Sequence, residues 1–154
     1  LLFYEASKKI ETYKKDIETP VANCTKDVID ETKICIIPIL RAGLAMSESI
    51  MKIVPNAKCG MIGLYRDSET KNPVEYLVKL PSDIASKKIF VVDPMLATGG
   101  SASYAIKLLK DKGAKDITLL SIIGAPEGLT FLYDGLEGIV GKVPESGVAV
   151  PSKL

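Results

Sequence analysis

The chain of 154 residues contains no histidine, and this absence excludes several classes of enzyme. Neither a Ser-His-Asp nor a Cys-His nucleophile can be assembled, and a zinc site ligated by histidine is equally impossible. An excess of positive charge is also missing, since 20 lysines and arginines face 19 acidic residues. A protein that binds nucleic acid through electrostatics needs such an excess, so we expect no nucleic-acid partner.

Long hydrophobic runs and paired cysteines are absent too. No apolar run reaches about 18 residues, so the sequence predicts no membrane-spanning helix. The three cysteines, Cys24, Cys35 and Cys59, form no CxxC pair and are odd in number. This usage is typical of reduced thiols in a cytoplasmic protein, and we expect them to be buried as small apolar side chains.

The remaining composition, 47% hydrophobic and 25% charged, is that of a globular protein. Its length fits one domain, to which we assign residues 1–154. The first residues, Leu1–Ala6, look like the middle of a helix. We therefore expect that a segment preceding this domain is missing.

Apolar strands alternate with amphipathic helices along the chain. Strands are expected at residues 33–40, 58–64, 88–92 and 116–123, with more exposed ones at 13–18 and 74–80, and helices at 1–12, 43–52, 101–112 and from Pro126 onward. Continuous β-branched runs separated by helices predict right-handed βαβ units. The expected fold class is α/β, a mostly parallel sheet covered by helices on both faces. Ligands of such sheets bind at the carboxyl ends of the strands.

One of these strand ends has the features of a phosphate site. The strand 88–92 is followed by the sequence Asp-Pro-Met-Leu-Ala-Thr-Gly-Gly-Ser. Gly99 and Gly100 allow the backbone to approach an anion, and the start of the next helix supplies free N–H groups and a favourable dipole. Asp93 is suited to accept ribose hydroxyls or to help hold a metal. The alternative is an ordinary strand-to-helix loop in which Ser101 is the N-cap.

Two arginines follow other strands. Arg41 stands before Ala-Gly at the end of strand 33–40 and is poised to clamp a phosphate or pyrophosphate, unless it is merely a surface arginine. Arg66 is either a second clamp or a solvated charge paired with Asp67. Two further patterns are rejected: residues 135–142 lack the spacing of a phosphate loop, and Glu127 is typical of a first-turn helix charge.

The segment Val91–Ala102 resembles the phosphoribosyl-pyrophosphate (PRPP) motif of the uracil phosphoribosyltransferases. That family places Asp-Pro before the glycine turn, as here at Asp93 and Pro94, where most phosphoribosyltransferases place two acids. The resemblance continues in order through residues 37–44, 62–67, 73–81 and 125–128 and covers roughly residues 1–134. It implies the type I phosphoribosyltransferase fold, with a parallel five-stranded sheet and a projecting β-arm.

The resemblance also implies a set of site residues. PRPP would be bound by Arg41, Arg66, Asp93, Pro94, Met95, Leu96, Ala97, Thr98, Gly99, Gly100 and Ser101. Arg41 and Asp93 would act in catalysis, Arg41 at the departing pyrophosphate. No residue is assigned as a direct metal ligand, since Mg²⁺ would arrive with PRPP. Residues 74–80 would belong to the projecting β-arm, which contributes to contacts in a homodimer or larger homo-oligomer.

The residues that bind the base stay unknown. The family's C-terminal hood reads Gly-Tyr-Ile-Val-Pro-Gly-Leu-Gly-Asp-Ala-Gly-Asp, and residues 147–154 match it only at Gly147, Val150 and Pro151. We therefore expect an incomplete hood and a chain truncated at this end as well. The expected reaction is uracil plus PRPP giving UMP and pyrophosphate. The alternatives are a PRPP-binding module without base recognition and an RNA-binding regulator on the same fold, which a net charge of +1 disfavours.

Overall fold

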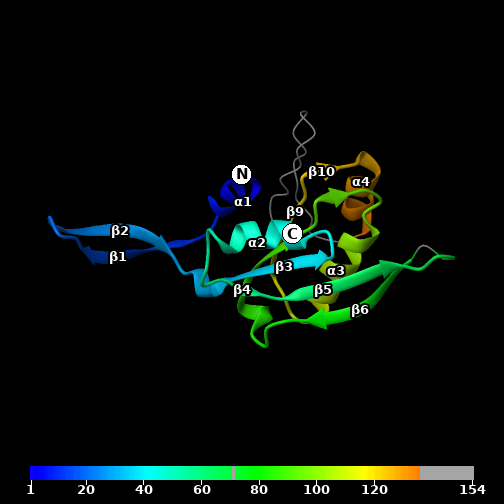
Figure 1. Ribbon diagram of the computed structural model, residues 1–154, viewed down its shortest axis with the longest axis horizontal. Coiled ribbons are helices and arrows are strands. Elements are labelled where there is room, and N and C mark those ends of the chain that lie inside the picture. Colours follow the sequence, from blue (N-terminus) through cyan, green and yellow to red (C-terminus); the bar gives the residue numbers. More distant parts are fainter. Residues whose placement is uncertain (71, 136–154) are drawn as a thin grey trace.

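The computed structural model of the protein describes residues 1–70 and 72–135 (Figure 1). The helices are α1 (Leu2–Ser7), α2 (Leu44–Met51), α3 (Gly100–Asp111) and α4 (Pro126–Gly135), and the strands are β1 (Thr12–Glu18), β2 (Asn23–Ile29), β3 (Ile34–Leu40), β4 (Lys58–Cys59), β5 (Met61–Arg66), β6 (Pro73–Lys79), β7 (Lys88–Val92), β8 (Met95–Leu96), β9 (Asp116–Leu120) and β10 (Ile123–Gly124). Within these residues, no helix combines the length and the apolar character needed to cross a membrane.

The central sheet has the strand order β6-β5-β3-β7-β9, with β4 also paired to β3. Strands β5, β3, β7 and β9 run parallel, and β6 pairs with β5 in the antiparallel sense. The expected α/β fold with a mostly parallel sheet is confirmed. The strand expected at residues 74–80 is β6, and it forms an edge of this sheet.

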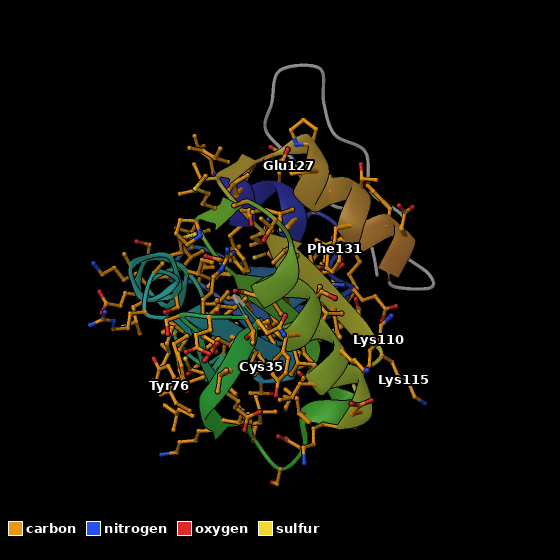
Figure 2. The ribbon with its side chains drawn as sticks, turned by 90° about the vertical axis from the view of Figure 1, so that its right-hand side faces the viewer. Cys35, Tyr76, Lys110, Lys115, Glu127 and Phe131 are labelled. Carbon is orange, nitrogen blue, oxygen red and sulfur yellow. The ribbon has the colours of Figure 1, made fainter. Side chains whose placement is uncertain are left out.

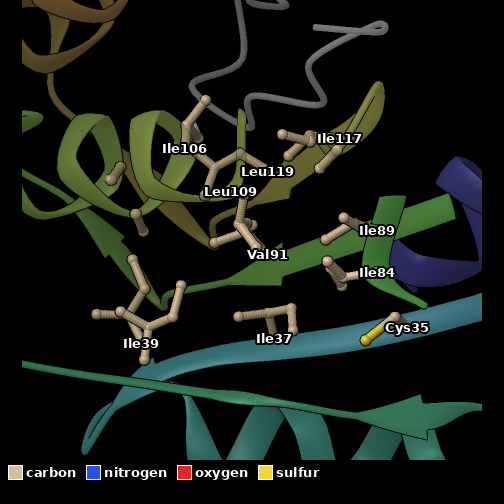
Figure 3. Packing of buried hydrophobic residues seen from close by; sticks show 14 of the residues in the cluster. Cys35, Ile37, Ile39, Ile84, Ile89, Val91, Ile106, Leu109, Ile117 and Leu119 are labelled. Atoms are coloured by element: carbon tan, nitrogen blue, oxygen red, sulfur yellow. The ribbon is translucent and has the colours of Figure 1, made fainter. Parts of the chain in front are cut away.

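Helices cover both faces of the sheet, and β3 at its centre is apolar at every position. In β3, Cys35 and Ile37 belong to the core beneath α3 and α4, whereas Ile34 and Ile36 belong to the core beneath α1 and α2. Strand β7 alternates in the same way. Figure 3 shows the first of these cores, in which the side chain of Ile106 from α3 packs on the sheet. A strand with two buried faces explains the continuous β-branched runs in the sequence.

Two local signals in the sequence have the expected structural outcome. The helix expected to end at residue 112 is followed by Gly113, which has φ of 85° after the C-cap residue Lys112, as is common where a helix ends. Pro126, expected at the first position of a helix, begins α4.

The N-terminal region differs from the sequence-based expectation. The helix expected at residues 1–12 ends at Ser7. The weak strand expected at 13–18 is β1, and it pairs with β2, which the sequence analysis missed. These two strands form a hairpin that extends away from the rest of the molecule (Figure 1). Its strands are mostly exposed and show no hydrophobic pattern in the sequence. The hairpin is held partly by polar contacts, such as the hydrogen bond from Lys14 Nζ to Asp27 Oδ2 at 2.9 Å.

The cysteines also differ from one another. Cys35 is buried, and burial raises the pKa of its thiol to about 12. Cys24 is only partly buried and Cys59 is exposed, so the expectation that these thiols are buried holds for Cys35 alone.

Helix α1 is attached to the sheet by an aromatic contact that can be tested. The rings of Phe3 and Phe90 meet edge to face with centroids 5.1 Å apart, and Phe3 is 5% exposed. We expect Phe3→Ala to lower the free energy of unfolding by about 3 kcal/mol, measured by urea denaturation. Tyr4→Ala, one residue away and 61% exposed, is the control and should change it by less than about 0.5 kcal/mol. Equal effects of the two substitutions would contradict this packing.

Candidate active site

The residues singled out from the sequence follow strands that end at the same edge of the sheet. Arg41 follows β3, Arg66 is the last residue of β5, and Asp93 follows β7. These three strands are parallel, so their carboxyl ends lie together. The edge is the one at which ligands of open α/β sheets bind.

The loop between β7 and α3 has the shape of an anion cradle. Gly99 has φ of 84°, a conformation that favours glycine, and it occupies the N-cap position of α3. The helix begins at Gly100, so the alternative in which Ser101 is the N-cap of an ordinary loop is wrong. The first N–H groups of a helix have no intrahelical partners, and in α3 no side chain of the cap residue accepts a hydrogen bond from them. Such groups, together with the helix dipole, are suited to bind a phosphate.

Gly100 leaves open space beside this cradle. A Cβ atom built on Gly100 would have one near neighbour, the Oγ1 atom of Thr98 at 4.0 Å. The protein itself therefore has room for a side chain at this position. A glycine here keeps the backbone accessible to a ligand.

Arg66 is joined to the cradle by a direct contact. Its guanidinium Nη2 donates a hydrogen bond to Thr98 Oγ1 at 3.1 Å, across 32 residues of sequence. Asp67, the alternative partner for this arginine, accepts hydrogen bonds within its own loop, from the backbone N–H of Glu69 at 3.1 Å and of Thr70 at 2.8 Å. The structure thus brings together two of the expected site residues, and Arg66 faces the phosphate loop.

Asp93 lies at the bottom of the same loop, partly buried. Its burial raises the pKa of the carboxyl group, while a hydrogen bond from the Met95 N–H and the charge of Arg66 lower it. Its own N–H donates to the Leu120 carbonyl at 3.1 Å, which ties it to the end of β9. A carboxylate kept short of solvent is well placed to accept hydrogen bonds from the hydroxyls of a bound sugar.

Arg41 follows β3 at this same edge of the sheet. Its side chain is exposed, and among the residues that the structure describes it makes no hydrogen bond or ion pair. The peptide bond between Leu40 and Arg41 is cis. Two residues later, Gly43 lies so close to the end of β7 that an added Cβ would overlap the carbonyl oxygen of Val92. Gly43, which the sequence analysis assigned no role, lets the Arg41 loop pack against the strand that carries Asp93.

The first half of the phosphate loop is held by a second, short sheet. Strand β8 pairs in parallel with β10, and the Pro94 carbonyl accepts hydrogen bonds from the N–H groups of Ile122 at 3.0 Å and Ile123 at 3.1 Å. Leu96 is 4% exposed and belongs to the core, whereas Met95 is 56% exposed. Of the expected PRPP-binding residues, Pro94 and Leu96 therefore support the loop from within. This pairing was not predicted, because strands of two residues carry no periodic pattern.

The expectations for the C-terminal region concern residues outside the described part of the chain. They include the rejected phosphate-loop pattern beyond residue 135 and the hood match at Gly147, Val150 and Pro151.

A mostly parallel sheet with a glycine-rich anion cradle after one of its inner strands, here β7, is the architecture of the type I phosphoribosyltransferases. The crystal structure of a purine phosphoribosyltransferase from Pyrococcus horikoshii shares this fold, with a TM-score of 0.56 and 24% identity over 60% of this chain and 62% of that one. The AQ2163 protein from Aquifex aeolicus is more similar, with a TM-score of 0.82 and 32% identity over 96% of this chain and 74% of that one.

Sequence comparison defines the family more narrowly. The family model described as uracil phosphoribosyltransferase matches residues 1–143. The uracil phosphoribosyltransferases of Lachnoclostridium phytofermentans and Clostridium botulinum are 52% and 47% identical over 87% and 98% of this chain. The chain belongs to the uracil phosphoribosyltransferase family, as its resemblance to that family implied. It spans 64% of the length of the Lachnoclostridium protein and 76% of the Clostridium protein.

The burial of Asp93 leads to a prediction about stability. Because folding raises the pKa of this carboxyl group, Asp93 favours the folded state below the unfolded pKa of about 4, and that contribution is lost as the pH rises through the folded pKa. We therefore expect Asp93→Asn to raise the melting temperature at pH 7, and the gain to shrink below about pH 4. Thermal unfolding monitored by circular dichroism measures the melting temperature at each pH. Glu18→Gln, an exposed change on β1, is the control, and a lower melting temperature for Asp93→Asn at pH 7 would contradict the argument.

Proposed function

We propose that the protein transfers the phosphoribosyl group of PRPP to uracil, producing UMP and pyrophosphate. The observation that carries this proposal is the β7–α3 loop, in which an uncapped helix start, Gly99 in a left-handed conformation and the carboxyl group of Asp93 stand together at one strand end. Membership of the uracil phosphoribosyltransferase family supports the choice of base. Arg41, Arg66 and the residues from Asp93 to Ser101 are proposed to bind PRPP.

The proposed chemistry asks the protein for positioning and charge stabilisation. The bond from the anomeric carbon of PRPP to pyrophosphate breaks, and pyrophosphate leaves with the electron pair. A ring nitrogen of uracil bonds to that carbon and releases its proton to the solvent. The transition state has oxocarbenium character, as in other glycosyl transfers. No side chain acts as a nucleophile, so the lack of histidine is no obstacle. The protein holds PRPP, stabilises the departing charge and keeps water away from the sugar.

Magnesium is proposed to enter as part of the substrate, bound to PRPP oxygens. Within residues 1–70 and 72–135, no group of three or more Cys, Asp or Glu side chains is arranged to hold a metal ion. Asp93 is the carboxylate that the phosphate loop offers. Mg²⁺ retains water readily and is often bound through substrate phosphates together with one or two carboxylates, and this donor set fits that mode.

We further propose a cytoplasmic homo-oligomer that binds PRPP and uracil. The cytoplasmic assignment rests on cysteines that are free throughout the described part of the chain, where none forms a disulfide. The oligomeric assignment rests on the family resemblance.

The test of this function combines binding with turnover. The wild-type protein should bind PRPP in the presence of Mg²⁺, measured by calorimetry, and form UMP from uracil, measured by chromatography. Gly100→Val should weaken PRPP binding by at least about tenfold with an unchanged melting temperature, since the new side chain fills the cradle and not the protein interior. Gly135→Val is the control, because no described atom lies within 4 Å of a Cβ there.

PRPP binding without UMP formation would favour the alternative, a module without base recognition. Unchanged PRPP affinity in Gly100→Val would refute the assignment of the cradle.

The exposed Arg41 should affect turnover more than affinity. The pyrophosphate gains charge only as the anomeric bond breaks, so a contact from Arg41 becomes stronger in the transition state. We expect Arg41→Ala to lower kcat about a hundredfold and to change the KM for PRPP by less than about threefold. Steady-state kinetics decide the point, with Lys52→Ala at the end of α2 as a control. A rise in KM with an unchanged kcat would mean that Arg41 binds ground state and transition state equally.

A further inference from the structure

Helix α4 touches the phosphate loop backbone to backbone. Gly128, in the first turn of α4, is buried, and a Cβ atom added to it would overlap the carbonyl oxygen of Ala97. The same Cβ would lie 3.0 Å from the carbonyl carbon of Ala97 and 3.2 Å from the backbone nitrogen of Gly99. The helix therefore approaches the loop as closely as only a glycine permits.

The contact is equally tight when viewed from the loop. A Cβ atom on Gly99 would lie 2.8 Å from the carbonyl oxygen of Gly128 and 2.9 Å from Cδ1 of Phe131. Figure 2 shows Glu127 at the start of α4 and Phe131 one turn later, on the side of the helix that faces α3. Two glycines, one on each side, thus form the contact, and Phe131 covers its edge.

The position of α4 is itself fixed by the core. Leu132 is 5% exposed and belongs to the same hydrophobic cluster as Leu96 and Ala102, which flank the phosphate loop. Just before the helix, the Ala125 N–H donates a hydrogen bond to the Leu96 carbonyl at 2.8 Å. The loop cannot shift away from its anion-binding shape on this side without displacing α4 from the core.

Helix propensity does not account for a glycine at this position. Glycine inside a helix is less favourable than alanine, so an exposed helix position gains stability from alanine. Gly135, at the other end of α4, has no described atom within 4 Å of its Cβ position, whereas Gly128 has the loop. The close approach to Ala97 is the physical reason for glycine at residue 128.

We propose that Gly128 is a positioning residue: through it, α4 holds the phosphate loop in its anion-binding shape before PRPP arrives. The N–H groups of the loop must point at the phosphate to bind it, and a loop that is already ordered loses less conformational freedom on binding. This role rests on the proposed binding of PRPP. It gives a function to the Ala-Pro-Glu-Gly segment of residues 125–128, in which Glu127 itself is an exposed first-turn residue.

The test uses two matched substitutions in the same helix. Gly128→Ala should push the loop away and weaken the binding of PRPP with Mg²⁺ by at least tenfold in calorimetry, although alanine favours the helix. Gly135→Ala makes the same chemical change where there is room, and should bind PRPP within twofold of wild type. In the free protein, the amide NMR signals of Gly99 and Gly100 should move in Gly128→Ala and stay in place in Gly135→Ala. At saturating PRPP, the kcat of Gly128→Ala should approach the wild-type value.

The outcomes separate this inference from the proposed function. Failure of the wild-type protein to bind PRPP would overturn both. Wild-type binding together with equal affinity and unmoved amide signals in Gly128→Ala would overturn the positioning role alone. If Gly128→Ala does not fold, Phe131→Ala decides the question, because this ring is 50% exposed and its loss leaves space. It should weaken PRPP binding two- to fivefold, and affinity equal to wild type would count against the inference.

Discussion

The pairing of β3 with β7 is the contact on which the rest of the structure depends. Five successive residues pair in parallel register, from Ile34 with Lys88 to Pro38 with Val92, and their side chains alternate between the two cores. A shift of one residue would exchange the two faces of each strand, so the register is strongly fixed. The loops that carry Arg41 and Asp93 follow directly. Their separation is therefore set by the sheet, and the packing of Gly43 under the Val92 carbonyl adds a second constraint.

The parts of the fold that could be predicted from the sequence are those with a regular pattern of apolar residues or with a glycine or proline that favours one backbone conformation. Strand β7 has the bounds expected for it, because residues 89–92 are β-branched or aromatic and buried, and Lys88 precedes them. The hairpin partner β2 could not be predicted in the same way, since it buries no residue and its pairing with β1 relies on the backbone ladder and on polar pairs such as Lys14 with Asp27. The hairpin is stabilised by contacts between β1 and β2, and the sequence of either strand alone does not reveal these contacts.

The candidate site divides along a similar line. The residue types of the phosphate loop and of Arg66 were visible in the sequence, but the hydrogen bond from Arg66 to Thr98 joins segments 32 residues apart and needed the fold. The alternative with Ser101 as N-cap was considered because hydroxyl residues commonly cap helices, yet the left-handed Gly99 occupies the N-cap position and the helix begins at Gly100. Gly43 and Gly128 were visible only as glycines. Their use depends on a carbonyl oxygen supplied by a distant strand or loop.

The phosphate loop would bind its anion largely through backbone N–H groups. The N–H groups of the phosphate loop carry no proton that titrates near neutral pH, and their directions are set by β7 below, by β10 beside β8 and by α4 against Ala97. Asp93 is the titratable group within the loop. A displacement at an anomeric carbon needs charge held in fixed places more than it needs a protein nucleophile. A chain without histidine can therefore support the proposed transfer, provided that the strands and α4 keep the loop in position.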